Sequence, residues 1–311
     1  MKTGSILGAL GLALMALVAS CASSPDRHME LGEEMFDEEA YKREYAAWQM
    51  VRVEELKAPN SWLSLAGLFW LKEGANTLGS SPDSDVRFPA HAPARVGVVT
   101  VTGDQASLEL EENLDATVSD QPFRSGKLDP GDYPDVPPDL VEMPPFSFKL
   151  MSRGGRLALR LFDRKAPTLT GFKGIETFPL DRQWRVTATY TRFQPPKVLE
   201  VSTAISTTEQ VTVPGEFSFV IDGDRHTLVP FSYPGAKELY LMFGDKTNGP
   251  STYGGGRFVL VPEPSGDTAV IDFNRAYNPP CAYTKFATCP IPRPENRLGI
   301  PITAGEKYSD H

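Results

Sequence analysis

Proline and glycine recur throughout this chain of 311 residues, and they limit how long its strands and helices can run. There are 28 prolines and 26 glycines, residue types that interrupt regular structure and favour turns. From Trp62 onward, short apolar or alternating runs stand between these turn residues. The pattern predicts a mainly β fold built of two antiparallel β-sandwich or partial-barrel modules.

The runs fall into two series, which we interpret as an N-terminal sandwich over residues 58–170 and a C-terminal β module over residues 171–277. The turn-rich stretch between residues 163 and 178 separates them. Strands of the first series are predicted over residues 64–71, 75–78, 86–88, 95–102, 106–110 and 116–118, and over a hairpin of residues 146–151 and 156–162. Strands of the second are predicted over residues 184–190, 197–202, 209–213, 216–221, 226–229, 239–243, 257–261 and 269–273.

Two proline-rich stretches are predicted to lie outside the sheets. Residues 129–145 contain six prolines and are expected to form a loop. Residues 278–311 form a proline-rich C-terminal segment. Because proline has no N–H to donate to a strand ladder, residues 278–301 are not expected inside a sheet.

One helix, over residues 36–57, is predicted before both modules. Apolar residues recur there at three- and four-residue spacings among charged ones, and Pro59 lies just beyond its end. We interpret the apolar stripe as packing surface rather than a ligand site. It comprises Phe36, Tyr41, Tyr45, Trp48, Val51, Val53 and Leu56.

The N-terminus has the layout of a secretory signal peptide: Lys2, an apolar run over residues 6–18 and a small-residue exit. The run is short for a bilayer span of about 20 residues. Leu17-Val18-Ala19-Ser20-Cys21 resembles a bacterial lipobox. This resemblance implies that residues 1–20 are removed and that Cys21 is acylated, with palmitate among its chains. An ordinary cleaved signal or a membrane anchor is the alternative.

The resemblance also implies a place in the bacterial cell envelope. Ala22 stands where an aspartate would resemble an inner-membrane retention signal. We therefore expect attachment to the outer membrane, facing the periplasm, with residues 21–35 as a tether. Without residues 1–20 the chain has 30 basic and 40 acidic residues, a formal charge of −10. This charge argues against nucleic acid as a partner.

Cysteine usage leaves one even pair. If Cys21 carries lipid, Cys281 and Cys289 remain, and an oxidising compartment favours a disulfide between them. Zinc and free thiols are the alternatives, but the chain has no CxxC or HxxxH spacing. We expect no metal and, since no GxGxxG opens a helix after a strand, no dinucleotide cofactor.

Residues 74–88 resemble the opening of a forkhead-associated domain, a β-sandwich that binds phosphothreonine. The resemblance lies in Gly74-Ala75-Asn76-Thr77-Leu78-Gly79-Ser80 and in Ser84-Asp85-Val86-Arg87-Phe88. Ser80 stands where that family has an arginine, and the later Ser-Arg-x-His pattern is absent. The resemblance therefore implies the sandwich more than the phosphopeptide site.

The C-terminal part contains several short sequence segments that resemble those of a bacterial and archaeal family known as domain of unknown function 1684. They are Thr252–Phe258, Asp272–Tyr283, Ala287–Pro290, Pro294–Leu298 and Ala304–Lys307, with Trp62–Leu68, Phe172–Ile175 and Phe178-Pro179 earlier. The resemblance is expected over roughly residues 48–307. It implies no established activity.

The same cluster is the candidate ligand site. Glycines before Arg257 permit close approach of a ligand, and paired arginines and asparagines suit a small anionic ligand or an envelope component. A tail that is stitched to the sandwich by these side chains is the alternative. The candidate residues are Tyr253, Arg257, Asn274, Tyr277, Asn278, Glu295, Asn296 and Arg297.

Catalytic patterns are sparse. No GxSxG nucleophile elbow occurs. His226 is a candidate general base, Cys281 a candidate nucleophile, and Asp245 with Asp272 a candidate acid pair. Three functions stay open: a lipid-anchored binding module, a hydrolase that uses the same cluster, and a structural envelope protein.

Overall fold

The computed structural model describes residues 36–131, 136–203, 208–233 and 235–308. The predicted signal peptide, Cys21 and the tether lie outside these ranges. The chain is mainly β, with one N-terminal helix and several sheets that include a half-barrel, so the predicted fold class is confirmed. In the described part of the chain, no helix is both long and apolar enough to cross a bilayer.

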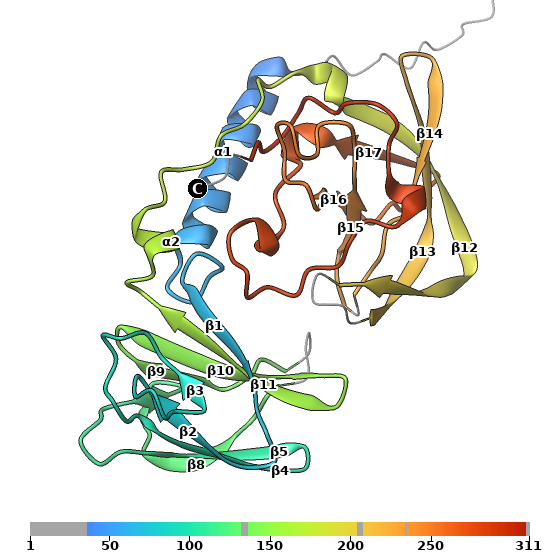
Figure 1. Ribbon diagram of the computed structural model, residues 1–311. Coiled ribbons are helices and arrows are strands. Elements are labelled where there is room, and N and C mark those ends of the chain that lie inside the picture. Colours follow the sequence, from blue (N-terminus) through green and yellow to red (C-terminus); the bar gives the residue numbers. More distant parts are fainter. Residues whose placement is uncertain (1–35, 132–135, 204–207, 234, 309–311) are drawn as a thin grey trace, which may run out of the picture. The chain divides into compact units, whose positions relative to one another are not determined.

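The N-terminal helix α1 spans Glu38–Lys57 (Figure 1), close to the predicted residues 36–57. Its buried side chains include Tyr41, Tyr45 and Leu56, three members of the predicted stripe. The hydroxyl of Tyr41 donates to the Asp272 carboxylate at 3.0 Å. These three residues are packing surface, as interpreted from the sequence, whereas Val51 is 57% exposed.

Strands β1 to β11 form two sheets around one core. One sheet has the order β1-β11-β10-β9-β6-β7 and the other β3-β2-β4-β5-β8. Between them lie Val99, Leu108, Phe148, Leu159 and other buried apolar residues. The strands are β1 Leu65–Trp70, β2 Gly74–Gly79, β3 Val86–Arg87, β4 Gly97–Thr102, β5 Gln105–Leu110, β6 Thr117–Val118, β7 Gln121–Pro122, β8 Ser125–Leu128, β9 Leu140–Met143, β10 Phe146–Arg153 and β11 Arg156–Asp163.

The predicted hairpin is present, with β10 and β11 antiparallel from Phe146↔Asp163 to Arg153↔Arg156. The prediction that all of residues 129–145 form a loop is wrong at its end. Residues Leu140–Met143 pair with β10 as strand β9. They carry no proline, and alternate residues Val141 and Met143 are buried, so this short stretch satisfies the requirements of a strand.

The later strands form a four-stranded sheet, β14-β13-β12-β17, and the pair β15-β16. These strands are β12 Arg185–Ser202, β13 Thr208–Ile221, β14 Asp224–Leu228, β15 Glu238–Phe243, β16 Arg257–Pro262 and β17 Thr268–Asp272. A short helix α2, Pro167–Thr170, and a 3₁₀ turn, η1 Arg182–Trp184, precede them. Residues Ala40–His311 form one compact unit, so the division into two modules stays a prediction.

Strands β12 and β13 are longer than predicted. Residues 184–190 and 197–202 were expected as separate strands because Pro195 and Pro196 lie between them. The structure runs one strand through this stretch and places the prolines where the pairing register shifts, between Arg192 and Lys197. At such an irregularity no ladder N–H is required, so proline is tolerated.

The C-terminal segment packs on these sheets without forming strands of its own in the described residues. A 3₁₀ turn, η2 Phe273–Arg275, precedes the segment, whose own regular elements are the 3₁₀ turns η3 Pro280–Ala282 and η4 Pro294–Asn296. Isolated bridges join Thr203 to Pro290 and Gly244 to Arg297. Leu298, Ile302 and Ala304 complete a core with Phe217, Leu241, Val259 and Phe273. A neighbouring core contains Val211, Phe231, Met242 and Phe258.

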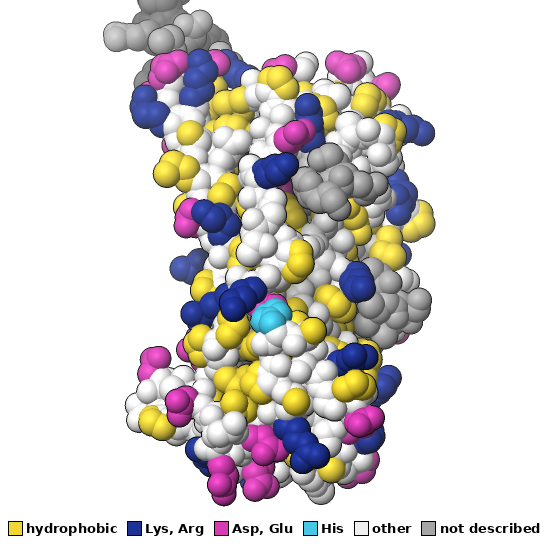
Figure 2. Space-filling model, turned by 60° about the vertical axis from the view of Figure 1, so that its left-hand side comes forward, with side chains coloured by type: hydrophobic (Ala, Val, Ile, Leu, Met, Phe, Trp, Pro, Cys, Tyr) yellow, Lys and Arg dark blue, Asp and Glu magenta, His cyan; other side chains and the backbone are white. Residues whose placement is uncertain are grey.

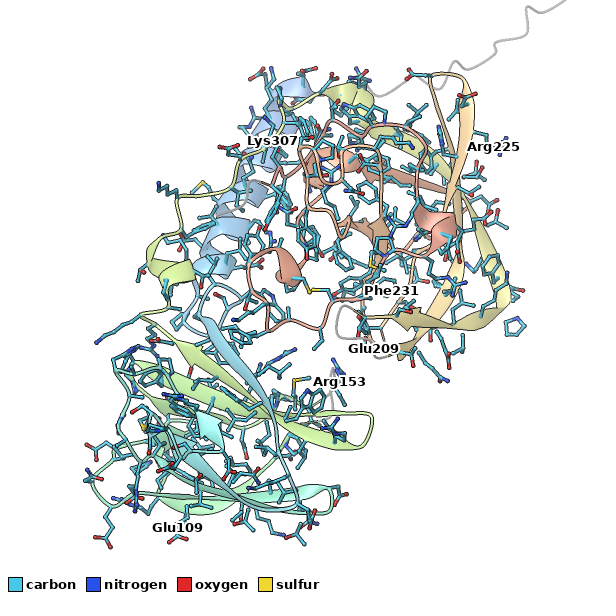
Figure 3. All side chains as sticks on the ribbon, in the orientation of Figure 1. Glu109, Arg153, Glu209, Arg225, Phe231 and Lys307 are labelled. Atoms are coloured by element: carbon cyan, nitrogen blue, oxygen red, sulfur yellow. The ribbon has the colours of Figure 1, made fainter. Side chains whose placement is uncertain are left out.

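Specific contacts join the two series of strands. Arg153, at the end of β10, lies toward Glu209 near the start of β13 (Figure 3), and Nε is 3.4 Å from the carboxylate. The hydroxyl of Thr284 donates to the Leu65 carbonyl at 3.4 Å. The C-terminal segment therefore contacts the first strand as well as the later sheets.

Candidate functional site

Arg257 is completely buried and is bound to the C-terminal segment rather than exposed to a ligand. One Nη lies 3.0 Å from the Asp245 carboxylate and 2.9 Å from the Ile302 carbonyl. The other donates to the carbonyl of Ala304. Burial lowers the pKa of Arg257, and the Asp245 carboxylate counteracts part of this effect. This arginine therefore secures residues 302–304 to β16.

Asn296 joins three segments with one side chain. Its amide group donates to the carbonyls of Val229 and Met242 at 2.8 Å each. Its carbonyl oxygen accepts from the N–H of Val229 at 2.8 Å. The residue is buried, so these bonds satisfy polar groups that water cannot reach.

Asn274 and Asn278 have comparable roles. Asn274 donates to Tyr41 Oη at 3.1 Å and to the Asp181 carbonyl at 2.8 Å. Asn278 donates through its side chain to the carbonyl of Lys307 at 2.9 Å. Both asparagines are buried. They connect α1 and the end of the chain to the turn that follows β17.

The other four predicted residues occupy different environments. Tyr277 stacks on Phe258 with ring centroids 5.8 Å apart. Tyr253 is partly exposed, and burial raises its pKa to about 12. Glu295 and Arg297 are exposed.

Of these eight residues, only Glu295 and Asn296 line either of the two main hollows in the described part of the chain. Glu295 and Asn296 border a hollow of about 20 Å³ between the β12–β13 pair and residues 293–296, which has room for a single water. The buried members, Arg257, Asn274, Asn278 and Asn296, bond to the protein itself. These bonds correspond to the stitched-tail alternative.

Glu306, which sequence reasoning did not select as a site residue, is a buried carboxylate with three partners from different parts of the chain. Its Oε1 lies 3.0 Å from Arg52 Nε on α1. Its Oε2 accepts from the Asn278 N–H at 2.7 Å and from the Tyr283 hydroxyl at 3.0 Å. The side chain is 1% exposed. Because its partners lie far away in the sequence, no spacing signal could have revealed this role.

A groove of about 470 Å³ lies beside α1, and the Arg52–Glu306 ion pair is part of its lining. Residues 176–178 pair with residues 305–307 through a Thr177↔Glu306 bridge and form the opposite side. Ile175 and Thr177 face the groove from alternate positions, as in a strand. The lining residues are Ala46, Trp48, Gln49, Met50, Arg52, Val53, Glu54, Ile175, Thr177 and Glu306.

The groove combines apolar and hydrogen-bonding side chains. Trp48 stacks on Tyr45 with centroids 5.7 Å apart. Gln49 donates to the hydroxyls of Tyr45 at 3.2 Å and Thr177 at 3.4 Å. Met50 is 71% exposed. An apolar wall with a few placed polar groups is typical of small-molecule sites.

The guanidinium of Arg52 forms one end of the groove and is held from several sides. It lies 4.8 Å from the Tyr277 ring centroid and 5.7 Å from that of Tyr283. Burial lowers the pKa of Arg52, but the Glu306 carboxylate outweighs this effect, and the pKa is raised overall. Arg52 therefore stays charged and fixed.

The predicted disulfide is not found: Cys281 and Cys289 are free thiols. The peptide N–H of each cysteine instead donates to the Sγ of the other, at 3.1 and 3.3 Å. The two residues are thus neighbours, as their spacing suggested, but without the covalent bond. Among the described residues, no cluster of three or more His, Cys, Asp and Glu side chains could hold a metal ion.

The candidate catalytic groups do not assemble. Asp245 pairs with Arg257, whereas Asp272 accepts from Tyr41, so the two carboxylates do not form a pair. His226 lies on β14 against the ring of Phe219, with the two ring centroids 5.8 Å apart.

On the face drawn in Figure 2, acidic and basic side chains are interspersed.

Comparison with known proteins identifies the C-terminal part. Residues 170–307 match the family model described as "Protein of unknown function (DUF1684)". The chain belongs to the DUF1684 family. The match includes the family-like segments from Phe172 to Lys307. Trp62–Leu68, which we expected to belong to the match, lies outside it. No curated protein matches the chain.

Nine solved chains match parts of this chain, and three of them illustrate the similarity. An uncharacterised protein from gene locus rrnAC0354 of Haloarcula marismortui is 34% identical, over 44% of this chain and 78% of that protein, with a TM-score of 0.39. Two FHA domains, one from a study of phosphothreonine-dependent interactions and one from FhaA in complex with the intracellular domain of Rv3910, are each 19% identical over 30% of this chain. The matched regions cover 92% and 96% of the two FHA domains, and both matches have TM-scores of 0.21.

Proposed function

We propose that this DUF1684 protein is a lipid-anchored envelope protein that binds a small ligand in the groove beside α1. The observation that carries the proposal is the groove itself, about 470 Å³ with an apolar wall and a polar end. That volume lies within the range of about 300–1,000 Å³ in which proteins hold small ligands. The other described hollow, at about 20 Å³, has room only for water.

The charges of the groove indicate the class of ligand. Two carboxylates, Glu54 and Glu306, line it with one guanidinium, Arg52, so the local balance is negative. The sequence-based expectation of an anionic ligand rested on Arg257 and Arg297, which do not line this groove. We therefore propose an uncharged or cationic ligand whose apolar body lies against Trp48 and Met50.

The N-terminal motif supports the envelope location. Acyl chains on Cys21 would anchor the protein, because two or more chains hold a protein at a membrane stably. Residues 22–35 extend to at most about 50 Å. Such a tether would let the groove reach ligands in the periplasm near the outer membrane.

Binding of a neutral apolar dye tests the groove. A chain beginning at residue 36, which contains the compact unit Ala40–His311, is titrated with N-phenyl-1-naphthylamine. We expect one saturable site in the wild-type chain. The substitution Met50→Lys places a charge in the groove and is expected to weaken binding at least about tenfold, the equivalent of about 1.4 kcal/mol.

Val220→Lys is the matched control, because Val220 is 55% exposed on β13 and does not line the groove. It should bind the dye as the wild type does, and both variants should melt at the wild-type temperature. Equal binding by all three chains, or no saturable binding, would leave the structural envelope protein as the better account.

A further inference from the structure

The two cysteines of the C-terminal segment hold each other's sulfur by main-chain hydrogen bonds. The N–H of Cys281 lies 3.1 Å from Cys289 Sγ, and the N–H of Cys289 lies 3.3 Å from Cys281 Sγ. Hydrogen bonds from peptide N–H groups stabilise a thiolate relative to a thiol. The two hydrogen bonds therefore hold the sulfurs next to each other, and each sulfur accepts from the N–H of the other residue.

The loop between the cysteines is fixed at both ends and in the middle. The N–H of Tyr283 donates to the Pro280 carbonyl at 2.9 Å, which closes η3 around Cys281. Thr284 bonds to the Leu65 carbonyl. Beyond Cys289, the N–H of Ile291 donates to the Ser202 carbonyl at 2.8 Å. A loop fixed in this way keeps the two sulfurs close without further ordering.

The two thiols differ in access. Cys281 is partly exposed, whereas Cys289 is buried, with 7% of its surface exposed. An external reagent can therefore reach Cys281 first. Reactive cysteine pairs commonly combine one accessible thiol of low pKa with a neighbouring thiol that resolves its adduct.

Electrostatics support the same division of roles. The hydrogen bond from the Cys289 thiol is the main effect that lowers the pKa of Cys281, to about 7; burial opposes it, and the Cys289 N–H adds to it. The same hydrogen bond, together with burial, raises the pKa of Cys289, while the positive charge of Arg160 lowers it slightly. Cys281 is the thiol that ionises first.

We propose that Cys281 and Cys289 form a thiol–disulfide exchange centre, in which Cys281 attacks an external disulfide and Cys289 resolves the product. This activity goes beyond ligand binding in the groove and does not depend on it. The co-reactant is an organic disulfide, either a small molecule or an exposed disulfide of another protein.

The exchange balances in two steps. The Cys281 thiolate attacks one sulfur of the disulfide, the S–S bond breaks, and one thiolate leaves and takes up a proton from water. Cys289 then loses its proton and attacks Cys281 Sγ, which forms the Cys281–Cys289 bond and releases the second thiolate. The protein dithiol loses two electrons, and the external disulfide gains them as two thiols.

Glutathione disulfide is the probe that tests this centre. The reduced full chain is incubated with it at pH 7, and peptides carrying Cys21, Cys281 and Cys289 are read separately by mass. In the wild type we expect a Cys281–Cys289 disulfide and no lasting adduct. Cys289→Ser is expected to accumulate glutathione on Cys281. In Cys281→Ser, the adduct on Cys289 should form at least about tenfold more slowly, since that thiol is buried and mostly protonated.

Circular dichroism and melting of each variant establish that it is folded. The single variants Cys281→Ala and Cys289→Ala repeat the comparison with a different side chain. Three results would overturn the proposal: both cysteines unmodified in folded wild type and in Cys289→Ser; equal adduct rates on the two cysteines; or a zinc ion, detected by native mass spectrometry, that protects both thiols. A fourth such result is resistance of the wild-type disulfide to reduction by glutathione, which would indicate a structural disulfide; its reduction would complete the cycle.

Discussion

The Arg52 guanidinium lies 3.0 Å from the Glu306 carboxylate, although 254 positions separate the two residues in the chain. This pair connects α1 to the C-terminal segment and forms one end of the proposed ligand groove. The same carboxylate accepts from Asn278 and Tyr283. The buried carboxylate of Glu306 therefore contacts α1 and the C-terminal segment and also lines the groove.

Replacing one member of this pair should destabilise the protein strongly. Glu306→Gln leaves Arg52 without its counter-charge, and breaking a buried pair from one side costs about 3–5 kcal/mol. Denaturant unfolding measures the change. Lys57→Gln breaks the exposed Glu54–Lys57 contact of the same helix and should leave stability unchanged. Equal stabilities of the two variants would contradict a structural role for Glu306.

Arg257 and Arg297, paired in the sequence-based hypothesis, should behave differently. Arg257→Lys retains the charge but cannot reproduce the bonds to Asp245, Ile302 and Ala304, because lysine lacks the planar fork of arginine. We expect a fall in melting temperature of several degrees. Arg297→Ala, at an exposed position, should melt with the wild type. A large effect of Arg297→Ala on stability would show that this assignment is wrong.

Asn296→Ala should cost more stability than Glu295→Ala. The first substitution leaves the N–H of Val229 and the carbonyls of Val229 and Met242 unpaired, at about 1–3 kcal/mol for each buried group that stays unsatisfied. The second removes an exposed carboxylate that contacts Arg293. Urea unfolding of both variants provides the comparison, and a Glu295 effect equal to that of Asn296 would refute it.

The rate at which iodoacetamide alkylates Cys281 should rise through a midpoint near pH 7. The groups that face this thiol are the thiol and N–H of Cys289, with the uncharged phenol of Tyr253 nearby. An ordinary cysteine has a pKa of about 8.5. Because only the thiolate reacts, the lower pKa makes Cys281 reactive at neutral pH. A midpoint above pH 8.5 would contradict this prediction.

Cys21 should carry lipid in cells that process bacterial lipoproteins. A fatty-acid analogue fed to such cells is expected to label the wild-type protein and to leave Cys21→Ser unlabelled and released from the membrane fraction. Cys281→Ser serves as the control that keeps the lipobox and should label normally. Labelling that persists in Cys21→Ser would remove the anchor from the proposed function.

The fold class could be predicted from the sequence because its signals are local. Alternation predicted the β10–β11 hairpin, and helical spacing predicted α1. Strand β12 was divided wrongly because two prolines were expected to end it, whereas the register shift between Arg192 and Lys197 accommodates them.

The site was less predictable because its contacts are non-local. Residue type alone indicated that Arg257 and Asn296 matter, but not that both would bond to the protein's own backbone. Glu306 lies in the family-like segment Ala304–Lys307, but no motif links it to Arg52, and the two residues meet only when α1 packs against the C-terminal segment. The groove depends on that meeting, so it could not be inferred before the fold was known.

Hydrogen–deuterium exchange of the residue 36–311 chain, with and without N-phenyl-1-naphthylamine, tests the proposed groove most directly. The groove predicts slower exchange in three segments that are distant in the sequence: residues 46–54, residues 175–177 and the backbone around residue 306. The Met50→Lys chain should lose this protection. Protection confined to residues 229–231 and 293–296, or none in any segment, would contradict a ligand site beside α1.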